Sequence, residues 1–85
     1  MTRHAELMGE RTRQDILKFI KDFTVTYRIS PTMREIRRGT GLASDSTVKH
    51  HIDIMVSKGE LIRHGDGKAR NLAVPGGVLF YPDDN

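Results

Sequence analysis

Apolar side chains recur at spacings of three and four residues in the first third of the chain, at Ile16, Phe19, Ile20, Phe23 and Tyr27. This spacing places them along one face of an α-helix. Thr12 can cap the start of that helix, and Ser30-Pro31 ends it because proline disfavours helical geometry in the residue before it. We therefore predict a first helix over about Arg13–Tyr27. Residues 1–11 show no sustained periodicity, and we expect a flexible lead there.

A second, shorter helix is predicted by the stretch TMRE at residues 32–35. In this capping box the threonine hydroxyl and the glutamate carboxylate each accept a hydrogen bond from the other residue's backbone N–H. Few apolar residues follow, and Gly41 ends the helix because glycine tolerates a left-handed backbone. Leu42 comes next, and we expect it to fill the space between helices.

A third helix is predicted over about Asp45–Lys58, with Ser44 as its N-cap. Its apolar residues, Val48, Ile52 and Met55, lie on one face, and polar residues occupy the rest of the surface. Lys58-Gly59 closes the helix, since a basic residue suits the negative end of the helix dipole and glycine fits the position after it.

Two short strands are predicted after the helices, over 61–63 and 71–74, joined by a loop whose Asp66-Gly67 is a hairpin signal. Two strands alone are not stable, so they must pack on the helices. The predicted fold is α+β and mainly α, a three-helix winged helix-turn-helix with a two-stranded β-hairpin as its wing. It occupies residues 12–74, between the lead at 1–11 and a tail at 75–85. The predicted core consists of Ile16, Ile20, Phe23, Ile36, Val48, Ile52, Met55, Leu61 and Leu72.

The chain has 85 residues, of which 36% are apolar, and it has no cysteine. This length allows one small domain and excludes separate cofactor and substrate domains. Without cysteine there are no disulfides and no thiolate zinc sites. No apolar run approaches the roughly 18 residues that would span a bilayer, and the N-terminus lacks the apolar core of a secretory signal. We expect a soluble, cytoplasmic protein.

Fourteen lysine and arginine residues outnumber eleven acidic residues, for a net charge of +3. The excess is concentrated between Arg28 and Arg70, where nine basic residues face five acidic ones. A basic middle suggests a polyanionic partner, although the excess is modest.

The stretch REIRRGTGLASDSTVKHHI at residues 34–52 has the pattern of a helix-turn-helix, in which the second helix enters the major groove of DNA. Its first turns carry the candidate base-reading residues: Ser44, Ser46, Thr47, Lys49 and His50. The candidate contacts to the DNA backbone are Thr32, Arg34, Lys68 and Arg70. Each residue alone is more typical of a cap or a solvated surface, but the combination with the hairpin favours DNA binding.

Four stretches carry a resemblance to a known family: TRQDILKFI at 12–20, SPTMREI at 30–36, GLASDSTVKHHI at 41–52 and SKGELIR at 57–63. Together they resemble the N-terminal winged helix-turn-helix domain of LexA-type repressors of the bacterial DNA-damage response. The resemblance implies base reading from the five positions named above, with the wing near phosphate. In that family a peptidase domain with a Ser/Lys dyad and the dimer contacts follows. This chain ends at Asn85, so we expect no self-cleavage and no inherited dimer surface, and a complete small regulator.

The predicted function is a sequence-specific, double-stranded DNA-binding transcription regulator, a repressor that occupies an operator. It would be bacterial or phage-encoded and associated with the nucleoid. We expect no enzymatic activity, cofactor, metal, membrane or small-molecule substrate, because carboxylates are scattered and adjacent His50 and His51 lack the spacing of a ligand pair. The apolar tail Val78–Tyr81 can add a strand, fold back on the helices or pair two copies into a homodimer on DNA. The alternative function is a winged-helix protein-interaction module that uses this tail.

Overall fold

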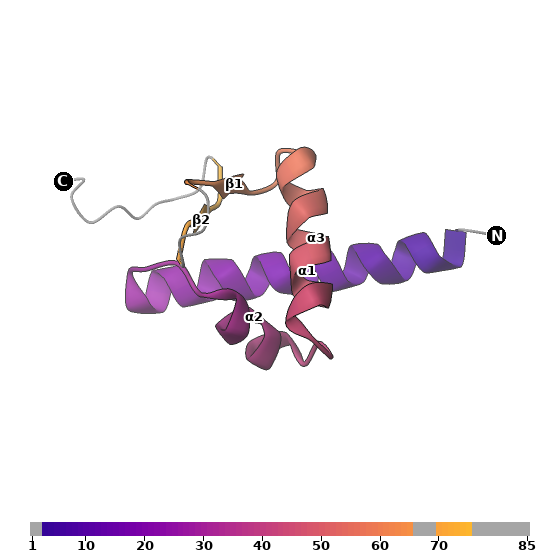
Figure 1. Cartoon of the computed structure of the whole chain (residues 1–85), viewed down its shortest axis with the longest axis horizontal. Coiled ribbons are helices and arrows are strands. Elements are labelled where there is room, and N and C mark those ends of the chain that lie inside the picture. The colour runs from indigo at the N-terminus through magenta and orange to yellow at the C-terminus, as the bar shows by residue number, and fades with distance from the viewer. Residues whose placement is uncertain (1–2, 66–69, 76–85) are drawn as a thin grey trace.

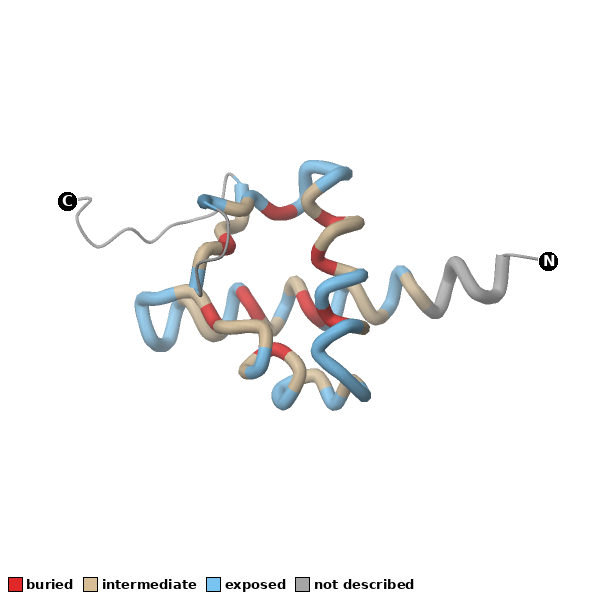
Figure 2. The backbone as a smooth tube through the Cα atoms, in the orientation of Figure 1, coloured by how far each residue is buried: buried red, intermediate tan, exposed pale blue. Residues whose placement is uncertain are grey.

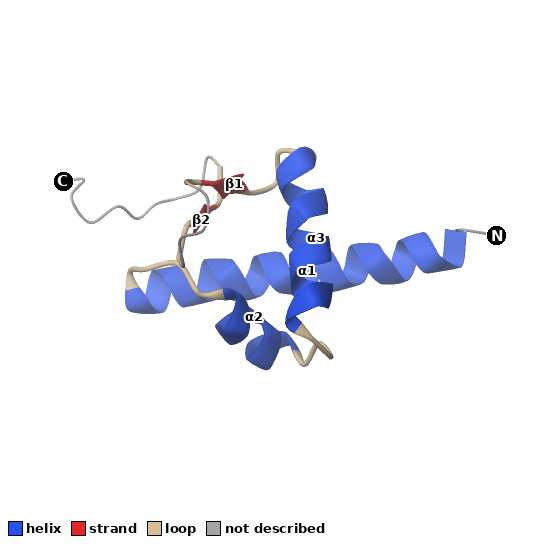
Figure 3. Ribbon diagram, in the orientation of Figure 1, coloured by secondary structure: helices blue, strands red, loops and turns tan. Residues whose placement is uncertain are grey.

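The computed structural model describes residues 3–65 and 70–75, which form three helices and a hairpin. In chain order the elements are α1 (Arg3–Tyr27), α2 (Met33–Thr40), α3 (Asp45–Ser57), β1 (Ile62–Arg63) and β2 (Leu72–Ala73). Helix α3 crosses α1, and α2 lies against both (Figure 1). The hairpin follows α3 and lies near the C-terminal end of α1 (Figure 3). The predicted winged helix-turn-helix fold is confirmed.

Helix α1 begins at Arg3, ten residues before the predicted start at Arg13, and that predicted boundary is wrong. Residues 3–12 contain no proline, and the single glycine, Gly9, costs a helix only about 1 kcal/mol. The periodic apolar stripe begins only where α1 meets the other helices, since its N-terminal part projects beyond them (Figure 1). The stripe marked the packed part of the helix and not its full length.

The caps of α2 and α3 form as the sequence predicts. The Thr32 hydroxyl accepts from the Glu35 backbone N–H at 3.1 Å, and the Glu35 carboxylate accepts from the Thr32 N–H at 2.9 Å. Gly41 follows α2 with a φ of 76°, and its N–H donates to the Arg37 carbonyl at 2.9 Å. The Ser44 hydroxyl accepts from the Thr47 N–H at 3.2 Å at the start of α3. These local bonds fix where the two helices of the helix-turn-helix begin and end.

The core lies where the three helices and the hairpin meet (Figure 2). Its buried apolar side chains are Ile16, Ile20, Ile36, Val48, Ile52, Met55, Leu61 and Leu72. Leu42 packs against them, as predicted. Phe23 was predicted in the core but is only half-buried. Its ring lies between those of Phe19 and Tyr27, at centroid distances of 5.7 and 4.5 Å, along the edge of α1.

The hairpin is antiparallel, and each strand is shorter than predicted. Ile62 pairs with Ala73 and Arg63 with Leu72, and the His64 N–H donates to the Asn71 carbonyl at 2.8 Å. The predicted turn at Asp66-Gly67, the candidate Lys68 and the tail Val78–Tyr81 lie outside the described residues. Within the described ranges, no helix has both the length and the apolar character needed to cross a membrane.

Candidate nucleic-acid interface

The first two turns of α3 present a row of polar side chains to solvent. Ser46, Lys49 and His50 are exposed, and they stand at positions i, i+3 and i+4, which are neighbours on a helix surface. The opposite side of the same turns carries the buried Val48 and Ile52. Figure 2 shows the start of α3 as an exposed segment beside the buried part of the molecule. The core therefore holds this row outward.

Ser44 and Thr47 lie at the edge of this row, and their hydroxyls are already engaged with each other. The two hydroxyl oxygens are 3.1 Å apart, and the Ser44 hydroxyl also caps α3. Ser44 is exposed and Thr47 is half-buried. The structure thus brings all five predicted base-reading residues to one end of α3, where two of them also stabilise the start of the helix.

Lys49 belongs to an ion-pair network that includes the wing. Its Nζ lies 3.0 Å from Asp53 Oδ2, one helical turn further along α3. The other oxygen of Asp53 accepts from Arg63 Nη2 on β1 at 2.7 Å. Hydrogen bonds from Arg63 and then from Lys49 lower the pKa of the Asp53 carboxyl. Sequence reasoning missed Asp53 and Arg63, and no local pattern points to a pair ten residues apart on two elements.

Arg70 stands where the chain returns toward β2, with a left-handed backbone φ of 58°. Its Nη1 donates to the Ser30 carbonyl at 3.0 Å and to Glu35 Oε1 at 2.9 Å, and its Nη2 donates to Glu35 Oε2 at 3.0 Å. The hydrogen bond from Arg70, followed by the one from the Thr32 backbone, lowers the pKa of the Glu35 carboxyl. Arg70, which the sequence predicts as a contact to the DNA backbone, is thus joined to the start of α2.

Helix α2 supplies further cations beside α3. Arg34 and Arg38 are exposed, one turn apart, and form no ion pair with any side chain in the described part of the chain. Arg37 instead donates through Nε to Asp45 Oδ1 at 2.6 Å, which joins the end of α2 to the first turn of α3. This pair neutralises Asp45, the acidic residue that directly precedes Ser46 of the polar row.

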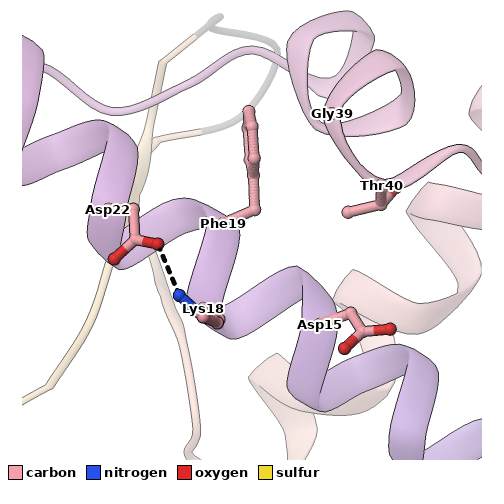
Figure 4. A pocket seen from close by; sticks show the side chains of 6 residues that line it. All are labelled: Asp15, Lys18, Phe19, Asp22, Gly39 and Thr40. Carbon is pink, nitrogen blue, oxygen red and sulfur yellow. Dashed lines mark hydrogen bonds and ion pairs between the residues drawn. The ribbon is translucent and has the colours of Figure 1, made fainter.

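The groove between α1 and α2 has a different character. A shallow hollow of about 260 Å³ is lined by Asp15, Lys18, Phe19, Asp22, Gly39 and Thr40 (Figure 4). Its one cation, Lys18, is paired with Asp22 at 2.9 Å. Two carboxylates against a single paired lysine disfavour an anion, so this hollow is not part of a phosphate-binding surface.

His51 lies on the inner side of α3 and faces α1. Its Nδ1 is 3.4 Å from Arg13 Nη1, and burial, followed by the charge of Arg13, lowers the pKa of the imidazole. His50 beside it is exposed, with the ring centroids 5.4 Å apart. Within residues 3–65 and 70–75, no three histidine, aspartate or glutamate side chains gather into a metal-binding group.

Three packed helices, a capped third helix with a polar outer face, and an antiparallel hairpin against it define a winged helix-turn-helix domain. The chain belongs to the LexA DNA binding domain family, whose model matches residues 8–71. The match starts within α1 and ends at the entry to β2, so it covers most of α1, all of α2 and α3, and strand β1.

Curated relatives agree with this assignment. The LexA repressor of Carboxydothermus hydrogenoformans is 47% identical over 49 residues, which cover 58% of this chain and 24% of the relative. The LexA repressor of Bacillus velezensis is 45% identical over 60 residues, covering 71% and 29%, and that of an Exiguobacterium species is 42% identical over 62 residues, covering 73% and 30%. The chain thus spans less than a third of the length of these relatives.

Proposed function

We propose that this chain is a sequence-specific, double-stranded DNA-binding transcription regulator that represses by occupying an operator through the major groove. The observation that carries the proposal is the exposed row Ser46, Lys49 and His50, held outward by the core at the capped start of α3. Ser44 and Thr47 complete the base-reading set at the edge of the row. The relatives' name, LexA repressor, supports repression as the outcome. The resemblance to LexA-type repressors suggests the DNA-damage response as the setting.

Lys49 is suited to base reading because it can leave its intramolecular partner at low cost. Asp53 has a second cation, Arg63, at 2.7 Å, so the carboxylate stays paired when Lys49 turns to a base edge. The pair that Lys49 gives up is exposed, and exposed pairs contribute only about 0–1 kcal/mol. A bidentate contact between lysine and guanine is worth about 1–3 kcal/mol of discrimination. The exchange therefore favours DNA.

Contacts to the DNA backbone are proposed from the residues beside α3. Arg34 is exposed and unpaired within the described part of the chain, and Thr32 stands with it at the start of α2, where helix N–H groups favour phosphate. Lys68 is proposed as the wing's phosphate contact from its sequence position alone. These contacts would set the register of α3 in the groove without carrying sequence information.

The first test is selection of the full chain against a random duplex pool at physiological salt. Enrichment of a defined motif is expected, and a two-fold motif would indicate two copies on the DNA whereas a single half-site would indicate one. Transcription in vitro from a promoter that overlaps the enriched site should then fall as protein is added. If no sequence is enriched above background, the proposal fails, and a protein-interaction module becomes the better reading.

The second test compares two lysines in the same setting. Lys49 and Lys18 each form an exposed i,i+4 pair with an aspartate, at 3.0 and 2.9 Å, but Lys18 lies on α1 away from the polar row. Lys49→Ala should cost about 1–3 kcal/mol on the selected site and relax the preference at one base pair. Lys18→Ala should change neither affinity nor preference. A loss for Lys49→Ala that is equal on all sequences would refute its base-reading role.

A further inference from the structure

We propose that Arg70 is a positioning residue that holds the wing against the start of α2 through Glu35 and the Ser30 carbonyl, and that it does not contact phosphate. This inference rests on the proposed DNA binding, whose interface includes the wing. It replaces the phosphate contact that the sequence alone suggests for Arg70.

The described hydrogen bonds of Arg70 use three of the five N–H donors of its guanidinium within the protein. Both terminal nitrogens donate to Glu35, at 2.9 and 3.0 Å, in the two-pronged arrangement that matches arginine to a carboxylate. The second hydrogen of Nη1 is used by the Ser30 carbonyl at 3.0 Å. One side chain thus joins the entry to β2 with Glu35 and Ser30, which lie 35 and 40 positions earlier in the sequence.

Glu35 cannot release Arg70 as Asp53 can release Lys49. Asp53 keeps Arg63 as a second cation, whereas Glu35 has Arg70 as its one cation among the described residues, with the uncharged Thr32 as a further donor. Turning Arg70 toward phosphate would leave Glu35 unpaired at the start of α2, beside the same phosphate. A carboxylate there would repel the DNA that Arg70 was to attract.

The hairpin needs such fastening because its strands are two residues long. Strands this short do not hold the hairpin in one orientation by themselves. The buried side chains of Leu61 and Leu72 attach the hairpin to the core but do not fix the direction in which it projects from the helices. Arg63 ties β1 to α3 through Asp53, and Arg70 ties the entry of β2 to α2 through Glu35. Each side of the hairpin is therefore attached to one helix of the helix-turn-helix.

Two substitutions separate positioning from phosphate contact. Glu35→Gln retains the capping box, which accepts glutamine at this position, but removes the charge that holds Arg70. If Arg70 positions the wing, Glu35→Gln should weaken DNA binding about two- to fivefold. If Arg70 contacts phosphate, its charge is already engaged with DNA in the parent, so removal of the Glu35 carboxylate should leave binding equal to that of the parent or tighter.

Arg70→Lys gives the second comparison, since lysine keeps the charge but not the two-pronged geometry. Positioning predicts that Arg70→Lys loses affinity, and a phosphate contact predicts binding equal to that of the parent. Arg11→Lys, at an exposed arginine on α1 that forms no ion pair in the described part of the chain, is the control and should leave binding unchanged. Affinities are measured by fluorescence anisotropy on the selected duplex. The temperature is one at which circular dichroism shows that all variants are fully folded, so that a loss of stability alone would not change the affinity.

Amide hydrogen exchange provides a readout that is independent of DNA. The His64 N–H, which bonds to the Asn71 carbonyl at 2.8 Å, should exchange faster in Arg70→Lys and Glu35→Gln than in the parent and in Arg11→Lys. If the parent does not bind DNA, the proposed function fails, while faster exchange still supports the fastening role. Unchanged exchange with parent-like affinity for Arg70→Lys would overturn the inference.

Discussion

Gly39 is the point at which α2 approaches α1 too closely for any side chain. A Cβ added there would lie 2.6 Å from both Cδ1 and Cζ of Phe19, and closer still to Cε1. Figure 4 shows the Phe19 ring standing between α1 and this turn of α2. We therefore predict that Gly39→Ala destabilises the domain, although alanine is the better helix former.

The magnitude follows from two opposing effects. Carbon atoms pack at about 3.5–4.0 Å, so the Phe19 ring must retreat by more than about 1 Å. Overpacking of this kind costs about 1–3 kcal/mol, and the helix propensity of alanine returns at most about 1 kcal/mol. The net loss is about 1 kcal/mol. For a domain of this size, that corresponds to a fall in Tm of about 4–8 °C.

The assay is urea unfolding at 25 °C of a double-mutant cycle. When Phe19→Ala removes the ring, Gly39→Ala should become neutral or stabilising, so its sign should change between the two backgrounds. Gly9→Ala in α1 is the control, because its Cβ meets only the flexible tip of Arg13, with Nη1 at 3.1 Å, and it should stabilise by about 1 kcal/mol. Equal stabilisation by Gly39→Ala and Gly9→Ala in the parent would refute the close approach.

Three further predictions concern stability. Ser44→Ala should lower the free energy of unfolding by about 1 kcal/mol through loss of the α3 cap, and Ser46→Ala, which removes no capping hydroxyl, should not; chemical denaturation distinguishes them. Burial lowers the pKa of His51 from its ordinary 6.5, so the folded state favours the neutral imidazole. The contribution of His51 to the free energy of unfolding is therefore complete above pH 6.5 and is lost as the pH falls below 6.5. His51→Gln should flatten this part of the plot of unfolding free energy against pH. Arg70 lowers the pKa of the Glu35 carboxyl, and Arg63 lowers that of Asp53. The free energy of unfolding should therefore fall further as the pH drops below the ordinary carboxyl range, and this fall should be smaller in 1 M salt.

The parts of the fold that the sequence predicted correctly are those governed by local rules. The capping box, the Ser44 cap and the left-handed Gly41 each depend on residues within four positions of one another. The apolar positions of the helices likewise identified six of the eight buried residues, because a helix facing a core has a fixed period, and the predicted strands supplied Leu61 and Leu72. Periodicity identifies only the part of a helix that packs on a core, and the N-terminal part of α1 projects beyond the other helices, so the start of α1 at Arg3 was missed.

The parts that the sequence did not predict depend on distance in three dimensions. Arg70 and Glu35 are 35 residues apart, and Arg63 and Asp53 lie on different elements. Composition shows that these charges exist but not which of them meet. Phe23 shows the same limit for packing, since its place in the stripe was correct while its depth depended on how far α2 and the hairpin reach along α1.

This distinction changes how the basic charge of the chain should be interpreted. Of the nine basic residues between Arg28 and Arg70, the structure commits Arg37, Arg63 and Arg70 to ion pairs that join one element to another. Cations held in this way shape the interface but release few counterions, because their charge is already balanced. The salt dependence of DNA binding should therefore be smaller than nine cations imply. A specific site must then gain much of its affinity from the α3 row or from a second copy on the same duplex, which is why the symmetry of the selected motif is informative.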